Sequence, residues 1–345
     1  MLSLFTFLEK KRTKNREIQM KDSKKGVVLL NMGGPDTLED VRPFLFNLFC
    51  DRQIIRLGPA FMQRPLAWLI ARRRAPKSRA IYAKIGGGSP LKSITLQQAD
   101  ALQKALSTEG NHLVAIAMRY WYPFADQALQ ALLRQGVDRI IVLPLYPHYS
   151  KATTGSSLHH FRESLERLAP GLPISIISSW QTQPSYIRAV AENITKGLQT
   201  FADREVTILY SAHSLPVSFI REGDPYVDHI TETIEAIEKL TGRKGKLCYQ
   251  SRSGPVEWLS PSTQETIERL AEAGCRNILM VPISFVSDHI ETLYEISILF
   301  KERAEQLGMY LHACDSLNTH PTFIQGLREL VCSVPENAAS EPVAL

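Results

Sequence analysis

The chain has 345 residues, of which 44% are apolar and 22% are charged, and this is the composition of one large or two ordinary folded domains. Such a composition excludes a disordered chain, a collagen-like fibre and a disulfide-stapled mini-domain. The longest apolar runs, at 140–146 and 278–285, have fewer than ten residues. They are too short to span a bilayer, which needs about 20 residues.

The net charge of +5, from 40 basic and 35 acidic residues, is unevenly distributed. Residues 1–25 hold eight basic and three acidic side chains, and residues 42–84 hold ten basic side chains against the single acid Asp51. The remaining chain has 22 basic and 31 acidic residues and is therefore negative. A local positive field indicates an anionic substrate, an acidic lipid surface or nucleic acid, unless it is only a solvated helix face.

The first 25 residues begin with an apolar stretch and continue with a basic one. A secretory signal has the reverse order, so we interpret residues 1–25 as a basic extension outside the fold. The cysteines are scattered and lack the C-x-x-C spacing of metal ligands, which favours reduced thiols in a cytoplasm. They are Cys50, Cys248, Cys275, Cys314 and Cys332.

Hydrophobic patterns predict strands and helices in alternation, which is typical of α/β folds with parallel sheets. In the first half we expect strands at 26–30, 113–118 and 140–145 and helices at 96–106 and 124–135. In the second half we expect strands at 206–210, 246–249 and 278–283 and helices at 226–240 and 262–273.

Two segments resemble each other without gaps at an offset of 138 residues. They are 136–144 (GVDRIIVLP) and 274–282 (GCRNILMVP). This internal similarity predicts two related halves. Each half would place its functional loops at the carboxyl ends of its strands, where open α/β sheets bind ligands.

Four polar loops follow predicted strands, at 31–35, 119–123, 211–216 and 287–292. His213 lies directly after a strand and could be a base, a metal ligand or a turn histidine. Asp288, His289 and Glu291 are three ionisable groups within four residues, which are costly to place near a core without a function. They would suit a proton relay or an open site for ferrous iron or zinc, but they are too few for a closed structural zinc site.

Two glycine-containing segments, 86–89 and 153–157, do not match the known phosphate-binding patterns. Close backbone approach is the favoured interpretation of both. The segment 60–74 combines apolar residues and Trp68 with Arg72, Arg73 and Arg74. It could be an interfacial membrane helix, a lid over a flat apolar ligand, or an ordinary buried helix.

Five motifs in order resemble the ferrochelatase family over residues 26–320. They are 30–35 (LNMGGP), 85–90 (IGGGSP), 149–157 (YS and TTGSS), 211–216 (SAHSLP) and 288–292 (DHIET). The resemblance implies two similar Rossmann-like domains, each a parallel β-sheet flanked by helices, with a porphyrin cleft between them. The expected divisions are the extension 1–25, an N-terminal half 26–180, a C-terminal half 181–330 and a tail 331–345.

The resemblance further implies a lyase that inserts ferrous iron into protoporphyrin IX in the final step of haem biosynthesis, giving protohaem with release of two protons. It implies that His213 and Glu291 are catalytic and contact the metal on one face of the porphyrin, and that Asp288 and His289 belong to an acidic proton or metal path. Met32 would lie on the opposite face. The other implied substrate-binding residues, several of them near the propionates, are Arg74, Tyr82, Ser89, Arg119 and Tyr120. The 60–74 lip would touch the membrane surface, which predicts a cytoplasmic protein with peripheral membrane contact.

Two departures sharpen these expectations. Lys151 or Ala152 stands where family members with an iron–sulfur cluster have a cysteine, and the C-terminus has no cysteine group, so we expect no cluster and iron only as substrate. Met32 favours protoporphyrin over coproporphyrin.

Two alternative functions stay open. One is a chelatase for another tetrapyrrole, such as coproporphyrin or sirohydrochlorin. The other is a porphyrin or haem carrier without turnover, which would have no need of the Asp288–His289–Glu291 cluster. Nucleic acid is not an expected partner, because no base-reading module accompanies the charge.

Overall fold

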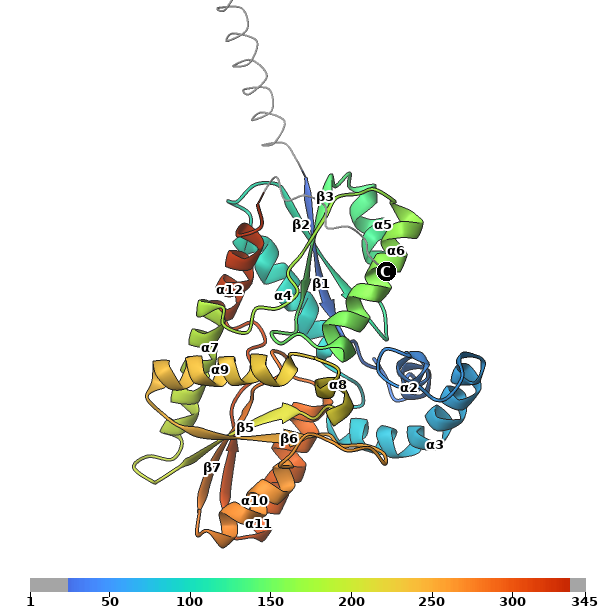
Figure 1. The fold of residues 1–345 in the computed structure, drawn as a ribbon. Coiled ribbons are helices and arrows are strands. Elements are labelled where there is room, and N and C mark those ends of the chain that lie inside the picture. Colours follow the sequence, from blue (N-terminus) through green and yellow to red (C-terminus); the bar gives the residue numbers. More distant parts are fainter. Residues whose placement is uncertain (1–23, 336–345) are drawn as a thin grey trace, which may run out of the picture.

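A computed structural model describes residues 24–335, which contain two four-stranded parallel sheets, one in each half (Figure 1). The first sheet has β1 (Lys25–Asn31), β2 (His112–Met118), β3 (Arg139–Pro144) and β4 (Ile174–Ile176). The second has β5 (Thr207–His213), β6 (Gly245–Gln250), β7 (Asn277–Pro282) and β8 (Tyr310–Ala313). The predicted fold class is confirmed. The predicted extension, 1–25, and tail, 331–345, lie for the most part outside the described residues.

The two sheets repeat one strand order. It is β2-β1-β3-β4 in the first sheet and β6-β5-β7-β8 in the second. The two similar segments at an offset of 138 residues contain β3 and β7, which occupy equivalent positions. The internal similarity therefore marks a structural repeat, and it places β1 and β5, with His213 at its end, in equivalent central positions.

Helices cover both sheets. They are α2 (Val41–Cys50), α3 (Gln63–Lys84), α4 (Leu91–Ala105), α5 (Ala125–Arg134), α6 (Ser156–Leu168), α7 (Pro184–Gln199), α8 (Val217–Arg221), α9 (Tyr226–Thr241), α10 (Thr263–Glu272), α11 (Lys301–Gln306) and α12 (Pro321–Cys332). A 3₁₀ turn covers Ala60–Met62, and π-helices cover Lys151–Gly155 (η2) and Glu291–Phe300 (η3). The expected helices at 124–135, 226–240 and 262–273 correspond to α5, α9 and α10.

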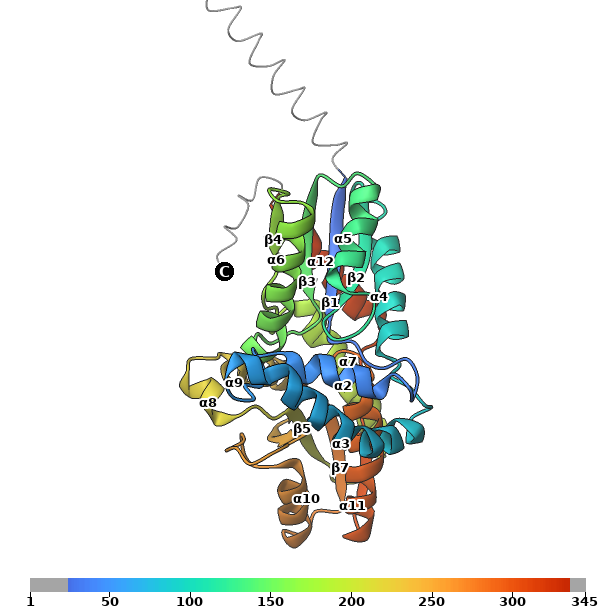
Figure 2. The ribbon, with the colours of Figure 1, turned by 90° about the vertical axis from the view of Figure 1, so that its right-hand side faces the viewer.

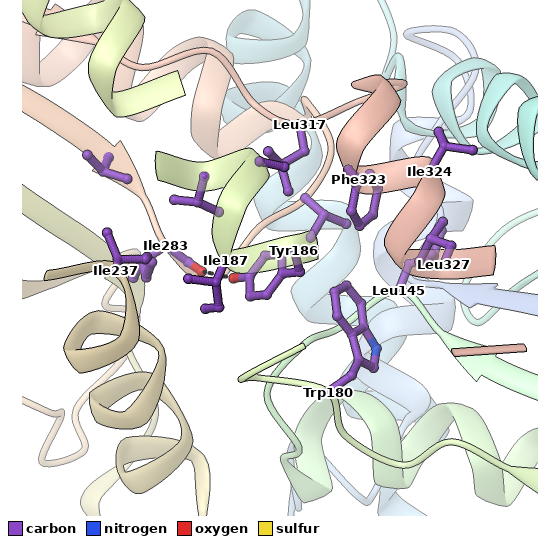
Figure 3. Close-up of a cluster of buried hydrophobic side chains, with 14 of the residues drawn as sticks. Leu145, Trp180, Tyr186, Ile187, Ile237, Ile283, Leu317, Phe323, Ile324 and Leu327 are labelled. Carbon is purple, nitrogen blue, oxygen red and sulfur yellow. Dashed lines mark hydrogen bonds between the residues drawn. The ribbon is translucent and has the colours of Figure 1, made fainter. Parts of the chain in front are cut away.

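One hydrophobic core extends through both halves. At its centre Trp180 stacks on Phe323 of α12 with ring centroids 6.0 Å apart and meets Tyr186 of α7 edge-on at 5.1 Å (Figure 3). The Nε1 of Trp180 donates to the carbonyl of Pro144 in β3 at 2.9 Å. The same cluster includes residues of both sheets, and α12 packs against α4 and α7 although it comes last in the chain (Figure 1). This shared core fixes one sheet relative to the other.

Helices α2 and α3 form a hairpin that lies across the level where the two halves meet (Figure 2). α3 buries a stripe of small side chains, Ala67, Ala71 and Ala75, at a spacing of four residues. The 3₁₀ turn before α3 and the first turns of α3 carry exposed apolar side chains, among them Phe61, which is 78% exposed, and Trp68. The interpretation of 60–74 as an ordinary buried helix is therefore wrong. Within residues 24–335, no helix is both long and apolar enough to cross a membrane.

The loops after β1 and before α4 pack closely against each other. The N–H of Ser89 donates to the carbonyl of Pro35 at 2.8 Å. A Cβ on Gly34 would lie 2.5 Å from the side chain of Ser89, closer than real Cβ atoms approach. Glycine is needed there for close approach. Within the 86–89 segment, the expected close approach occurs at Gly88, where a Cβ would clash with the carbonyl of Asp36.

We expect Phe323→Ala to lower the free energy of unfolding by about 3–5 kcal/mol, because it removes a fully buried ring from the shared core. Urea unfolding followed by tryptophan fluorescence and by circular dichroism would measure this loss. Both signals should shift together, since the core belongs to both halves. Leu240→Ala, at an exposed site, is the control. Two separate transitions, of which only one moves, would contradict a shared core.

Candidate active site

A histidine and a glutamate from two elements of the C-terminal half form a hydrogen-bonded pair. His213 is the last residue of β5, and Glu291 is the first residue of the η3 π-helix. The Nδ1 of His213 lies 2.8 Å from Oε2 of Glu291. Since a carboxylate can only accept, Nδ1 carries the hydrogen, and Nε2 is the nitrogen left for a ligand. The His213 side chain is 36% exposed, whereas Glu291 is mostly buried.

His213 and Glu291 shift each other's pKa. Burial works against a charged His213, but the nearby carboxylate of Glu291 outweighs it and raises the pKa of His213. Burial likewise works against ionisation of Glu291, but His213 outweighs it and lowers the pKa of Glu291. The pair can therefore hold a proton as an imidazolium–carboxylate ion pair and release it as neutral imidazole.

A second carboxylate shares a hydroxyl with Glu291. The Oγ of Ser251 lies 2.6 Å from Oε2 of Glu291 and 2.8 Å from Oε2 of Glu295. One hydroxyl hydrogen cannot serve both carboxylates, so this arrangement is favourable when Glu295 is protonated and donates to Ser251. In agreement, burial and the charge of Glu291 raise the pKa of Glu295 to about 7.

His289 lies on the other side of Glu291. Its Nδ1 donates to the carbonyl of Ser287 at 3.1 Å, and its Nε2 accepts no hydrogen bond and lies 3.9 Å from Oε1 of Glu291. Burial lowers the pKa of His289, which favours the neutral form of this imidazole. The carboxylate of Asp288, the residue before His289, accepts hydrogen bonds from Asn318 and Thr292.

The N-terminal half contributes an aromatic cluster next to these groups. Tyr82 and Tyr120 are buried in it, and Met32 and Ile290 pack against it. Ile290 directly precedes Glu291, and burial and the charge of Glu291 raise the pKa of Tyr82. Tyr82 therefore lies near Glu291, and Met32 and Tyr120 belong to the same cluster.

Arg119 is held by a buried carboxylate. Its guanidinium lies 2.9 Å from Oδ2 of Asp51 and donates from Nε to Ser156 at 2.7 Å. The hydroxyl of Tyr120 donates to Asp51 at 2.7 Å, and Ser156 also binds this carboxylate. Burial opposes ionisation of Asp51, but Arg119 and these hydrogen bonds outweigh it and lower the pKa of Asp51.

Arg74 and Ser89 are the remaining predicted residues. Arg74 of α3 donates to Ser253 of the C-terminal half at 2.8 Å. Lys84, the last residue of α3, lies over the ring of Tyr294 in η3 at 5.3 Å. Ser89 packs against Gly34 in the loop after β1. In this structure α3 thus contacts the C-terminal half at two points where the sequence predicted a cleft.

Within residues 24–335, no three His, Cys, Asp or Glu side chains are arranged to hold a metal ion. His213 and Glu291 offer one nitrogen and one carboxylate. This arrangement suits transient contact with a metal rather than a closed structural site.

Comparison with known proteins identifies the family. The ferrochelatase family model matches residues 24–334. The chain belongs to the ferrochelatase family. It is 60% identical to the ferrochelatase of Desulfotalea psychrophila over 313 residues, covering 91% of this chain and 98% of the relative. It is 50% identical to the ferrochelatase of Geotalea uraniireducens, covering 89% and 97% of the two chains.

Membership confirms the predicted family, and with it a metal-inserting lyase that uses a porphyrin and ferrous iron. Among solved structures, "SirB from Bacillus subtilis with Fe3+" covers 89% of this chain and 94% of its own, with a TM-score of 0.50 and 12% identity. At that identity the similarity concerns the fold alone.

Several residues at the ferrochelatase site were not singled out from the sequence. Ser251 and Glu295 gave weak signals, since a serine in a polar loop and a glutamate in an apolar helix have many structural explanations. Asp51 had a stronger signal, because it is the only acid among residues 42–84. A lone acid in a basic segment is a candidate for a buried partner of arginine.

We expect Glu291→Gln to lower the pKa of His213 to below its ordinary value of 6.5. The substitution removes the carboxylate that raises this pKa and leaves the burial that lowers it. NMR titration of isotope-labelled histidine would measure the change. Glu295→Gln is the matched control and should cause a smaller fall, since Glu295 contributes less. An unchanged titration of His213 in Glu291→Gln would contradict the coupling.

Proposed function

We propose that the tetrapyrrole substrate is protoporphyrin IX and that it binds between Met32 and the His213–Glu291 pair. The observation that supports this most directly is the hydrogen-bonded pair itself, which lies beside an aromatic cluster from the other half. A flat apolar ring would fit against such a cluster while its central nitrogens face the imidazole. Met32 on the cluster side favours protoporphyrin over coproporphyrin.

His213 serves as the first base in this proposal. Metal insertion requires the porphyrin to lose two protons, and the Nε2 of a neutral imidazole can accept one. Glu291 stabilises the imidazolium that forms, because its carboxylate lies 2.8 Å from Nδ1. His213 and Glu291 would also contact ferrous iron as it enters, by the nitrogen and oxygen donors that suit this ion.

Protons then leave through the groups behind Glu291. His289 is neutral, and its Nε2 lies 3.9 Å from Oε1 of Glu291, so it can take up a proton as the intervening carboxylate shifts. Glu295 can exchange a proton near neutral pH through the hydroxyl of Ser251. Asp288 lies beyond His289 and would continue the path towards solvent.

Arginines would receive the propionates. Arg119 is oriented by Asp51 and keeps part of its side chain exposed. Arg74 contacts Ser253 across the two halves. We propose that this contact opens when the porphyrin enters and that Arg74 then binds a propionate in place of Ser253.

The start of α3 would dock on an acidic membrane surface. Phe61, Trp68 and Leu69 are exposed, and the guanidinium of Arg72 lies over the Trp68 ring at 5.5 Å. Exposed apolar and aromatic side chains beside arginines are the features of an interfacial helix. A cytoplasmic enzyme with peripheral membrane contact fits this surface and the five free cysteines. We expect no resident iron–sulfur cluster.

Anaerobic incubation with protoporphyrin IX and ferrous iron, followed at the Soret band, would test the catalytic assignment. We expect multiple turnovers for the wild-type protein and a loss of about 10²–10⁴-fold in kcat for His213→Ala and Glu291→Gln. Thr231→Ala, an exposed site on α9, is a control that should retain activity.

A porphyrin carrier would give a different result. It would bind one equivalent without turnover, and His213→Ala and Glu291→Gln would not change that binding. A preference for coproporphyrin over protoporphyrin in kcat/KM would contradict the substrate assignment while leaving the chemistry in place.

We expect binding to vesicles with acidic headgroups to weaken in the double variant Phe61→Ser/Trp68→Ser, because apolar contact area is lost. Arg72→Gln/Arg73→Gln should weaken it too and should reduce its salt dependence. Vesicle co-sedimentation at several salt concentrations measures both effects. Leu240→Ser, at an exposed apolar site on α9, is the control. Equal binding by all variants would exclude this surface.

A further inference from the structure

The loop that carries Asp288 and His289 is held from outside by a residue near the C-terminus. Asn318 lies between β8 and α12, and its side chain makes two hydrogen bonds with Asp288. Its Nδ2 donates to Oδ2 of Asp288 at 2.7 Å, and its Oδ1 accepts the backbone N–H of Asp288 at 2.9 Å. Its own N–H donates to the carbonyl of Val286 at 2.8 Å. Asn318 therefore fixes both the backbone and the carboxylate of Asp288.

The backbone conformation of Asn318 also restricts which residue types can occupy this position. Asn318 has a φ of 44°, in the left-handed region that asparagine and glycine adopt more readily than other residues. An asparagine here provides both the backbone conformation and the two-point contact. Few other side chains could provide both together.

A glutamine from the other half fixes Asn318 in turn. Gln98 is fully buried on α4, and its Nε2 donates to the carbonyl of Asn318 at 2.8 Å and to Oγ of Ser287 at 2.9 Å. A backbone carbonyl only accepts, so the amide nitrogen must be the atom that faces Asn318. One N–H group of Gln98 thus binds the loop that carries Asp288, and the other binds Asn318, which holds that loop.

The same face of α4 also holds the end of β1 in the N-terminal half. Thr95, one helical turn before Gln98, accepts a hydrogen bond from Nδ2 of Asn31 at 3.1 Å. The Oδ1 of Asn31 accepts the N–H of Met32 at 2.8 Å. Thr95 and Gln98 therefore bind the end of β1, directly before Met32, and the loop after β7, which carries residues assigned to the opposite side of the porphyrin.

We propose that Asn318 and Gln98 are positioning residues for iron insertion, which set the Asp288–His289 loop at a fixed place relative to the loop that carries Met32. This inference rests on the proposed role of that loop in proton removal. His289 and Glu291 are separated by 3.9 Å, and a small displacement of the loop would interrupt transfer between them. Neither Asn318 nor Gln98 touches the reacting atoms.

Two single variants and their combination would test this proposal. Asn318→Gly keeps the left-handed backbone and removes the amide, and Gln98→Met removes both donors at similar volume. We expect each to lower kcat by about 10–100-fold, as loss of an outer partner of a catalytic group does. The KM for protoporphyrin should stay within about twofold, because transition-state positioning rather than binding is lost. The double variant should be no worse than the more damaging single variant.

Hydrogen exchange provides a readout that does not depend on activity. Peptides covering 286–292 should exchange faster in both variants, while the sheet strands stay protected. The matched control is Asn277→Ala. Asn277 is a buried asparagine, and its Nδ2 donates to the carbonyl of Glu205 at the opposite end of β7. Asn277→Ala should lower the free energy of unfolding, but it should not accelerate hydrogen exchange at 286–292 and should not cause a comparable loss of kcat.

Three outcomes would overturn the proposal. Unchanged exchange of 286–292 in folded Asn318→Gly and Gln98→Met would show that these residues do not hold the loop. A kcat within about twofold of the wild type would show that holding it does not matter for the reaction. Strictly additive losses would show that the two residues act separately. If instead the wild-type protein fails to insert iron, the proposed function is wrong, and exchange alone still decides whether the loop is held.

Discussion

The structure depends on one hydrophobic core that two parallel sheets share. Each sheet delivers its polar loops at the carboxyl ends of its strands, but a site made from both sets of loops requires the sheets to keep a fixed relation. Three buried rings keep the sheets in place, because they connect β3, α7 and α12. They belong to Trp180, Tyr186 and Phe323. The last helix thus returns to the first half. Unlike two separately folded domains, the halves cannot lose their alignment without losing core packing.

Within that frame, the charged groups of the site stabilise each other in pairs. A buried carboxylate is costly unless it is paired or protonated, and both solutions occur side by side. Glu291 is ionised and paired with His213, whereas burial and the neighbouring charge of Glu291 raise the pKa of Glu295 to about 7. Proximity separates the pKa values of two chemically similar groups. The site can therefore hold a carboxylate as electrostatic partner and another as proton acceptor at one pH.

The sequence singled out the central residues of the candidate site but not the residues that hold them in place. Strand periodicity predicted the α/β class, and the position of His213 after a strand predicted its place at the sheet edge. The cluster 288–291 was conspicuous because three ionisable groups followed an apolar strand. The π-helical form of 291–300 and the contact between Asn318 and Asp288 could not be predicted, since they depend on tertiary packing between segments 30 residues apart. The role of Gln98 could not be predicted either, because a polar residue on a helix usually faces solvent.

The sequence shows how many positive charges the basic segment 42–84 carries, and the tertiary contacts show where those charges lie. Four of its arginines lie over aromatic rings. Arg42 and Arg72 lie on the Trp68 ring, Arg64 on Phe46 and Arg74 on Phe49, all within 5.6 Å of ring centroids. Cation–π contact keeps a guanidinium charged and largely hydrated, with donors left free for an anion. Asp51, the single acid of the segment, is buried against Arg119 instead. The positive charges of this segment therefore remain free to bind an anion, as at Arg72. Its single acid, Asp51, instead holds Arg119 in a defined orientation inside the protein.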